Sequence, residues 1–332
     1  MSGRIRIGVV GAGLMGLRHA RVLASMPGVE LAGVVDTDEA ARQRAVRSLG
    51  VAATSSLAQL AASNPQAVVV ALPDDAHREV TLEALDRGLA VLVEKPLATS
   101  VEDAEAIVKA ARGRLLMVGH LLRFDPRYLG ARRRVQAGEL GGLLHTYARR
   151  NSASGATLRY GATTRLPWHV SIHDLDALRW VTGREVVTMR AHGVSRVFAR
   201  LEQLDSLQAL LRLDDGSTAV IESCWALPAH LGSAIDSRLE VAGTQGMLEV
   251  TGFEQGLFVA DRSSSTYPDT TRYAEYEDGA GGGILAAELA HFVRCIDRGV
   301  PPSVAPEDGL AAVRLAAALE QSLREDREVR LS

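Results

Sequence analysis

The sequence predicts an α/β protein, in which an N-terminal, doubly wound parallel sheet is followed by an α+β domain with a large open, mostly antiparallel sheet. Short apolar strands alternate with helices over the first 120 residues, whereas strands follow one another over most of the chain after residue 122. The length of 332 residues exceeds what one hydrophobic core usually serves. We therefore expect two domains, residues 1–122 and 123–332, with the last helices free to pack back near the first.

The first strands and helix surround a glycine turn. The β-branched run 5–10 has the length of one buried strand, and the turn Gly11-Ala12-Gly13-Leu14-Met15-Gly16 follows it directly. Residues 14–25 show the spacing of a helix with a narrow polar face, and a second strand over 30–35 ends in Asp36. This order of strand, glycine turn, helix, strand and acid is the Rossmann fingerprint of a dinucleotide-binding unit.

Each residue of the fingerprint has a physical task. Gly11 allows the tight turn, Gly13 lets the backbone approach a pyrophosphate, and Gly16 lets the helix pack closely on the strand. The pyrophosphate lies on the unpaired N–H groups at the start of the helix. Asp36 can accept hydrogen bonds from the ribose hydroxyls, so the sequence predicts NAD as the cofactor.

The residues around Asp36 disfavour NADP. Asp36 would meet a 2′-phosphate with like charge, and Asp38 and Glu39 add negative charge nearby. No arginine directly follows Asp36, and the nearest one downstream is Arg42. We therefore expect NAD to be preferred.

Strands and helices continue to alternate as far as residue 122. The expected strands are residues 51–53, 67–72, 90–93 and 115–118, and the expected helices are 38–48, 57–62, 76–87 and 100–111. Ligands of a doubly wound sheet bind at the carboxyl ends of its strands, where the notable residues are Pro73, His77, Glu94-Lys95-Pro96, His120 and Arg123. Lys95 is one of only two lysines in the chain.

Strands dominate the chain after residue 122. The expected helices are 126–137, 168–181, 284–298 and 306–324, and the expected strands are 144–150, 186–198, 205–213, 217–226, 237–242 and 247–251. Residues 151–165 are expected to form a polar loop, and residues 252–283 an irregular surface segment.

The helix over 168–181 carries a second group of candidate residues. His169 and His173 are four residues apart and project on one face, with Asp176 one turn beyond His173. Such residues also occur as helix caps or satisfied core groups, and His-x-x-x-His is an ordinary metal-ligand spacing. The glutamate of a zinc-protease motif and an obvious third ligand are missing, so we predict no metal.

Motifs along nearly the whole chain resemble those of the glucose–fructose oxidoreductase/inositol dehydrogenase (Gfo/Idh/MocA) family. They are the glycine turn, Pro73 with His77, Glu94-Lys95-Pro96, Arg123-Phe124-Asp125-Pro126, Ile172-His173-Asp174-Leu175-Asp176, Glu288-Leu289-Ala290-His291-Phe292 and Pro306-Glu307-Asp308-Gly309. Together they are specific for the family but not for one substrate within it.

The resemblance implies an NAD-dependent dehydrogenase or reductase that transfers a hydride between nicotinamide and a secondary alcohol or ketone of a sugar, sugar derivative or cyclitol. His173 matches the histidine that acts as acid/base in the family, and Lys95 would polarise the same substrate oxygen. The position four residues before this histidine is commonly an aspartate in the family, whereas this chain has His169. His169 is therefore a third candidate catalytic residue, with a proton relay that departs from the family pattern.

Two sets of contact residues are expected. The cofactor contacts are Gly11, Gly13, Leu14, Met15, Gly16, Asp36, Thr37, Leu72, Pro73, His77, Glu94 and Lys95. The candidate substrate contacts are His120, Arg123, Asn151, His169, Asp176 and Trp225. A redox-neutral NAD-dependent sugar-modifying enzyme, such as a glycosidase, and a non-catalytic NAD- or sugar-binding regulator remain as alternatives, because fold does not fix function.

Composition and charge limit the kinds of partner and the location that we expect for the protein. The formal net charge of −3 gives no reason to expect nucleic acid or an anionic membrane, and no apolar stretch reaches the ~18 residues of a spanning helix. Only Cys224 and Cys295 occur, without metal-ligand spacing, which favours a reduced, cytoplasmic protein. Strands such as 209–213 and 219–221 carry apolar residues on both faces, and the family usually covers such a sheet with a second subunit. We expect a homodimer or homotetramer.

Overall fold

The structure is a computed structural model that describes residues 4–160, 164–228, 235–252, 257–260, 265–267, 269–274, 276 and 280–331. The chain divides into two compact units, each with its own sheet. The first unit contains residues 1–121 and 270–310, and the second contains residues 122–269 and 311–332. Residues 270–310, which the sequence prediction placed in the second domain, group with the first unit.

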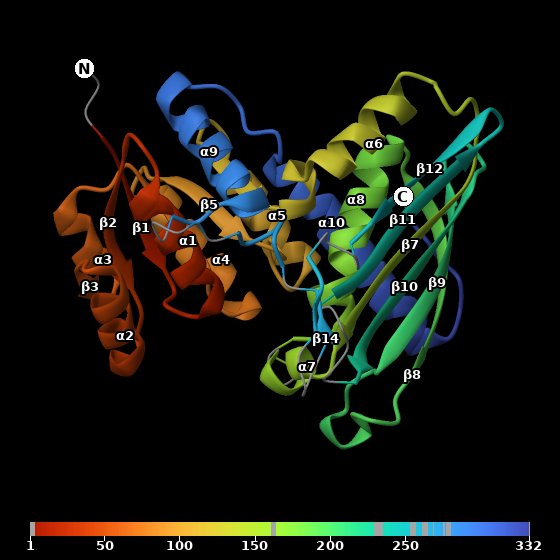
Figure 1. The fold of residues 1–332 in the computed structure, drawn as a ribbon, viewed down its shortest axis with the longest axis horizontal. Helices are drawn as coiled ribbons and strands as arrows, with labels where there is room; N and C mark the ends of the chain where they lie inside the picture. The colour runs from red at the N-terminus through yellow and green to blue at the C-terminus, as the bar shows by residue number, and fades with distance from the viewer. Residues whose placement is uncertain are drawn as a thin grey trace. The chain divides into compact units, whose positions relative to one another are not determined.

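The first unit is built on a parallel sheet of six strands (Figure 1). They are β1 (Ile5–Val10), β2 (Val29–Val35), β3 (Ala53–Thr54), β4 (Ala67–Val70), β5 (Ala90–Glu94) and β6 (Leu116–Gly119). The strand order is β3-β2-β1-β4-β5-β6, with every pair parallel. The order reverses between β1 and β4, which is the switch point where this fold binds dinucleotides. The predicted doubly wound sheet is therefore confirmed.

Helices connect these strands, and local sequence signals explain their ends. They are α1 (Leu14–Ser25), α2 (Glu39–Leu49), α3 (Leu57–Leu60), α4 (His77–Asp86) and α5 (Val101–Ala110). The Asp38 carboxylate caps α2 by accepting from the N–H of Ala40, and the Ser100 hydroxyl caps α5 by accepting from the N–H of Asp103. Gly50 ends α2 in the left-handed conformation that glycine adopts most easily.

The sheet of the first unit is buried on both faces. All four residues of β4, including Val68, Val69 and Val70, are fully buried. Helix α9 (Gly283–Arg298) packs on α1, and the N–H of Val118 donates to the carbonyl of Val304. Residues from beyond position 270 thus complete the core of the N-terminal sheet.

The second unit is built on a mixed sheet of seven strands. They are β7 (Leu143–Ala153), β8 (Val186–Val194), β9 (Ser206–Leu213), β10 (Thr218–Leu227), β11 (Ile235–Gly243), β12 (Gly246–Thr251) and β15 (Val329–Arg330). The order is β12-β11-β7-β10-β9-β8-β15, and every pair is antiparallel except β7 with β10. The prediction of a mostly antiparallel sheet is confirmed. A separate two-stranded ladder joins β13 (Val259–Ala260) to β14 (Ser265–Thr266).

Helices cover one face of this sheet (Figure 1). They are α6 (Pro126–Gln136), α8 (Ile172–Thr182) and α10 (Pro306–Glu325), and a short helix α7 (Gly155–Tyr160) follows β7. The sheet residues below them, such as Ala148 and Ile221, are fully buried. On the other face Leu210 is 58% exposed and Met247 is 63% exposed. The sheet is therefore covered on one side within the chain.

The sequence prediction was wrong about two stretches of the second unit, and a third, the expected helix, differs in type at its start. The expected loop 151–165 is strand as far as Ala153, where β10 still flanks β7, and it then contains α7. The expected strand 186–198 stops at Val194, because the Asp205 carboxylate binds the N–H groups of residues 196–198 and turns the chain. The expected helix 168–181 begins as a π-helical turn, Pro167–Ser171, and becomes α-helical at Ile172.

Candidate active site

The glycine turn of the first unit has the geometry that the fingerprint requires. Gly11 has a φ of +104°, and a side chain there would clash with the carbonyl of Ala71. A side chain at Gly16 would clash with the carbonyl of Gly11, so the helix and the turn are in close contact. Gly13 and Leu14 are exposed, and nothing lies within 4 Å of where a Gly13 side chain would start. A dinucleotide phosphate fits against this open backbone at the start of α1.

Asp36 is fixed by backbone donors at the end of β2. Its Oδ2 accepts from the N–H of Ala12 at 2.7 Å, and its Oδ1 accepts from the N–H of Asp38 at 2.8 Å. Each carboxylate oxygen has a second acceptor position, so the residue can still bind two ribose hydroxyls. Arg42 Nη1 donates to the carbonyls of Asp36 and Thr37 at 2.8 and 2.9 Å, which sequence reasoning did not foresee.

His77 joins the two loops that follow β4 and β5. It is fully buried, with Nδ1 2.7 Å from the carbonyl oxygen of Pro96 and Nε2 3.0 Å from that of Leu72. Pro73, next to Leu72, is exposed. The imidazole of His77 thus holds the backbone of these two loops together, and Pro73 is an exposed residue of the first loop.

Glu94 and Lys95 lie at the carboxyl end of β5. The Glu94 Oε1 is 2.8 Å from Nε2 of His19, a fully buried residue of α1, and Glu94 Oε2 accepts from the N–H of Lys95. Burial alone would raise the pKa of the Glu94 carboxyl, but the hydrogen bond from His19 and the nearby positive charges lower it. Lys95 itself is half-buried. His19 was not among the predicted site residues, although a single histidine on the apolar face of a predicted helix is a signal for a buried polar contact.

His169 and His173 of the second unit are partly exposed within an otherwise buried segment. Between residues 166 and 178, His169 and His173 are the only positions that are not fully buried. The N–H of Ile172 donates to the carbonyl of Pro167, five residues earlier, which is the bond that defines the π turn. Both residues are therefore partly exposed on an otherwise buried element. The ring centroids of His169 and Trp225 are 6.2 Å apart.

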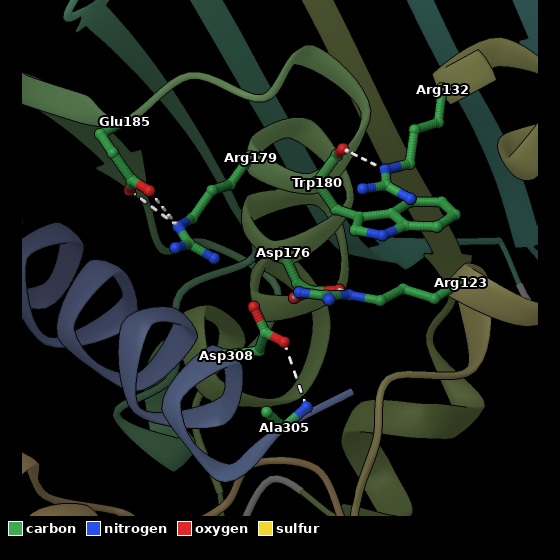
Figure 2. Close-up of polar contacts among 8 residues, drawn as sticks. All are labelled: Arg123, Arg132, Asp176, Arg179, Trp180, Glu185, Ala305 and Asp308. Atoms are coloured by element: carbon green, nitrogen blue, oxygen red, sulfur yellow. Dashed lines mark hydrogen bonds and ion pairs between the residues drawn. The ribbon is translucent and has the colours of Figure 1, made fainter. Parts of the chain in front are cut away.

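Two buried ion pairs hold the helix that carries His173. Arg123 Nη2 and Nε donate to Asp176 at 2.6 and 3.0 Å. Figure 2 labels both side chains. Arg150 Nε and Nη2 donate to Asp174 at 2.8 and 3.0 Å. Arg123 and Asp176, both expected as substrate contacts, therefore form an ion pair with each other. Each pair has the two parallel hydrogen bonds of a guanidinium with a carboxylate.

Tyr128 of α6 lies beside this network. Its hydroxyl is almost completely buried, and burial raises the pKa of Tyr128 to about 12. The Tyr128 hydroxyl therefore stays protonated and is unsuited to act as a base.

The other expected substrate residues lie in separate places. Trp225 is fully buried, and its indole N–H donates to the carbonyl of Leu204 at 2.5 Å. Asn151 Nδ2 donates to Glu222 at 2.8 Å, on the face of the sheet opposite to the one that packs on the histidine segment. His120 is buried directly after β6. The structure brings Trp225 to His169, but it does not bring Asn151 to the histidines.

No metal-ion arrangement or membrane span occurs in the described parts of the chain. Among those residues, no group of three or more His, Cys, Asp or Glu side chains could hold a metal ion. None of the described helices is both long and apolar enough to cross a membrane.

Comparison with known proteins agrees with the geometry. Residues 5–120 match the oxidoreductase family with an NAD-binding Rossmann fold, and residues 128–249 match the Gfo/Idh/MocA C-terminal domain. Inositol 2-dehydrogenase of Acidothermus cellulolyticus is 30% identical, over 98% of this chain and 94% of its own. Scyllo-inositol 2-dehydrogenase (NAD(+)) of Bacillus subtilis is 28% identical, over 100% and 97%.

A solved structure shows the same fold. The myo-inositol dehydrogenase of Corynebacterium glutamicum superimposes with a TM-score of 0.82 at 27% identity, over 99% of both chains. The sequence motifs, the strand order of the first unit and these similarities agree with one another. The chain is an NAD-dependent oxidoreductase acting on CH–OH groups and belongs to the Gfo/Idh/MocA family.

Proposed function

We propose that this protein is a dehydrogenase of cyclitols or related sugars, with Lys95 and His173 as its catalytic residues. The observation that carries the proposal is the accessibility of His169 and His173 within an otherwise buried segment. Two titratable side chains held on a rigid element are suited to repeated proton transfer. When bound, NAD supplies the hydride acceptor of the reaction.

Lys95 donates a hydrogen bond to the substrate oxygen. Its ammonium group stabilises the negative charge that develops there when the hydroxyl proton leaves. The backbone on both sides of Lys95 is held in place, because its own N–H donates to Glu94 and the carbonyl of Pro96 lies 2.7 Å from Nδ1 of His77. These contacts fix the place from which the lysine side chain projects.

His173 takes the hydroxyl proton in the oxidation direction and returns it in the reduction direction. An imidazole suits both steps because it exchanges a proton near neutral pH. His169, one turn earlier on the same face, is the second imidazole through which this proton can pass. A shared proton between two imidazoles would replace the charged aspartate that the family commonly has there.

The charges of the second unit favour an uncharged substrate. Arg149 pairs with Asp236, Arg150 with Asp174, Arg123 with Asp176 and Arg165 with Glu320. These arginines are therefore matched by acids of the same unit and offer little net positive charge to a sugar acid. Since relatives are named inositol 2-dehydrogenases, we place a neutral cyclitol first among the candidates.

The exposed face of the seven-stranded sheet is proposed to bind a second copy of the chain. Leu210 and Val220 lie opposite each other on neighbouring strands of this face, and Met247 lies on it near the far edge. A sheet of this kind needs a cover for apolar side chains. Light scattering at working concentration should give the mass of a dimer or tetramer, and a monomeric mass would contradict this part of the proposal.

A substrate panel read by NADH absorbance tests the function. Cyclitols, aldoses, sugar acids and nucleotide sugars are offered with NAD, and we expect net NADH release with a neutral cyclitol. Turnover without NADH release would indicate the redox-neutral alternative. On the best substrate, Lys95→Met should lower kcat about a hundredfold or more. His173→Ala should lower it about 10²- to 10⁴-fold.

NAD affinity separates catalysis from folding in these variants. Neither side chain is needed to hold the pyrophosphate or the ribose, so NAD binding should stay near that of the wild type. Folded variants of both residues with near-normal kcat would show that the catalytic groups lie elsewhere.

A further inference from the structure

A second glutamate of the first unit is buried, and no cation pairs with it in the part of the chain that the structure describes. Glu288 of α9 is 1% exposed, and its Oε1 has no hydrogen-bond partner among the described residues. Its neighbours on the same helix face, Leu285, Leu289 and Phe292, are apolar. Such a placement is costly for an ionised carboxylate, because an unpaired charge loses its hydration.

Glu288 lies close enough to Glu94 for the two carboxyl groups to interact electrostatically. Glu94 already has the donors that an anion needs, namely His19 Nε2 at 2.8 Å and the N–H of Lys95. Two neighbouring buried carboxyl groups cannot both ionise at low cost, so one of them keeps a proton. The donors identify Glu94 as the anion and leave the proton to Glu288.

We propose that Glu288 is a protonated acid at neutral pH and acts as a positioning residue for the Glu94-Lys95-Pro96 turn. Glu94, His19 and Glu288 then form a cluster that joins β5, α1 and α9, in which Glu94 is the ionised carboxylate. The role in catalysis rests on the proposed function of Lys95, whereas the proton on Glu288 does not. In the sequence, Glu288 stands out only as part of a family motif.

The cluster has a direct consequence for Lys95. Glu94 faces charged or titratable groups from three other positions, since His19, His77 and Lys95 all lower its pKa, after the opposing effect of burial. A second negative charge on Glu288 would compete for these groups and draw the turn towards α9. Keeping Glu288 neutral therefore keeps Glu94 bound to His19 and holds the backbone of Lys95 in one place.

The pH dependence of stability follows in sign. Burial and the neighbouring Glu94 raise the pKa of Glu288 well above its ordinary value. The folded protein then holds a proton that the unfolded chain releases near pH ~4.3. Wild-type stability falls as the pH rises from that value through the folded pKa. Glu288→Gln, which cannot ionise, should gain Tm relative to the wild type over the same range.

Infrared spectroscopy of the full chain without NAD or substrate tests the proton itself. A protonated carboxyl group absorbs apart from a carboxylate, and ¹³C-labelled glutamate separates it from buried aspartates such as Asp174. At neutral pH we expect a protonated-glutamate band in the wild type and in the control Glu102→Gln, an exposed position of α5. The band should be absent in Glu288→Gln. A wild type without the band, or a Glu288→Gln protein that keeps it, overturns the proposal.

Kinetics test the positioning role. Glu288→Leu should lower kcat by about tenfold or more, because a misplaced catalytic group can cost up to about a hundredfold. Glu288→Gln should restore most of that loss and retain kcat to higher pH than the wild type. Equal losses in both variants would overturn the positioning role.

The two proposals fail in different measurements. Normal kcat in Lys95→Met would reject the proposed function while the infrared band still reported the proton on Glu288. A missing band with an inactive Lys95→Met would reject the proton and leave the function standing.

Discussion

The carboxylates of the two units are held by different kinds of donor. In the first unit, the half-buried Asp36 is held by the backbone N–H groups of Ala12 and Asp38. In the second unit, Asp174 and Asp176 are fully buried, and each is held by an arginine side chain. Backbone donors leave acceptor positions open for a ligand, whereas the arginine pairs use the carboxylates to hold a helix in place.

This difference teaches which residues can change without loss of the fold. Asp36 keeps contact with water, so its charge remains solvated when its surroundings change. Asp174 and Asp176 depend on their partners, because a buried carboxylate without its cation is strongly destabilising. We therefore expect substitutions in the first set to alter ligand preference and those in the second to alter stability.

The largest effect is expected from Arg150→Met. The change leaves Asp174 buried without its cation and should lower the free energy of unfolding by about 3–5 kcal/mol. Denaturant unfolding at neutral pH measures this loss. The loss should shrink at acid pH, because the orphaned Asp174 carboxyl then takes up a proton.

Arg238→Met is the matched control for an exposed pair. Arg238 forms ion pairs with Glu240 and with Glu249, the latter at 2.6 Å, and the three side chains are 36%, 24% and 32% exposed. Its loss should cost about 0–1 kcal/mol. Similar losses in Arg150→Met and Arg238→Met would break the comparison between buried and exposed carboxylates.

An intermediate effect is expected from Asp36→Ala. Loss of a charged hydrogen bond to the ribose costs about 1.5–3 kcal/mol, or about 10- to 150-fold in kcat/KM for NAD. The kcat/KM for NADP should fall less than that for NAD, or should rise, because the like charge at position 36 disappears and Arg42 remains beside the turn. Ser100→Ala is the control, since it removes the cap of α5 and leaves the charges around Asp36 unchanged. An unchanged NAD/NADP ratio in Asp36→Ala would contradict the proposed role.

The sequence could predict most of the first unit because its signals are local. The glycine turn and Asp36 lie on one strand–helix–strand unit, and the spacing alone relates them to the cofactor. The four-residue spacing of His169 and His173 likewise predicts one helix face, and both residues are partly exposed in the structure. Such features need no knowledge of distant partners.

The sequence could not predict side-chain pairing between distant residues. Arg123 and Asp176 are 53 residues apart, so their ion pair was invisible and both were assigned to the substrate. His19 and Glu94 are 75 residues apart. The Asp205 carboxylate likewise accepts from the N–H groups of residues 196 and 197, and these bonds end a strand whose β-branched residues favoured a longer extent. Each of these contacts depends on how separate elements meet.

The smallest effect, and the finest test of the second unit, is expected from His169→Asp. A carboxylate one turn before His173 stabilises the imidazolium form, which is inactive as the base for alcohol oxidation. The acidic limb of the kcat profile should therefore move to higher pH by about one unit, which corresponds to ~1.4 kcal/mol. The fold should tolerate the change, because position 169 is partly exposed.

His145→Asp serves as the control for the added charge alone. His145 is exposed on β7, outside the histidine segment, so this variant should leave the acidic limb in place. An equal shift of the acidic limb of the kcat profile in both variants would show that the shift comes from the overall charge and not from the residue next to His173. A limb that moves in neither would show that the side chain at 169 does not set the basicity of the catalytic group, and the two-histidine relay would then have to be abandoned.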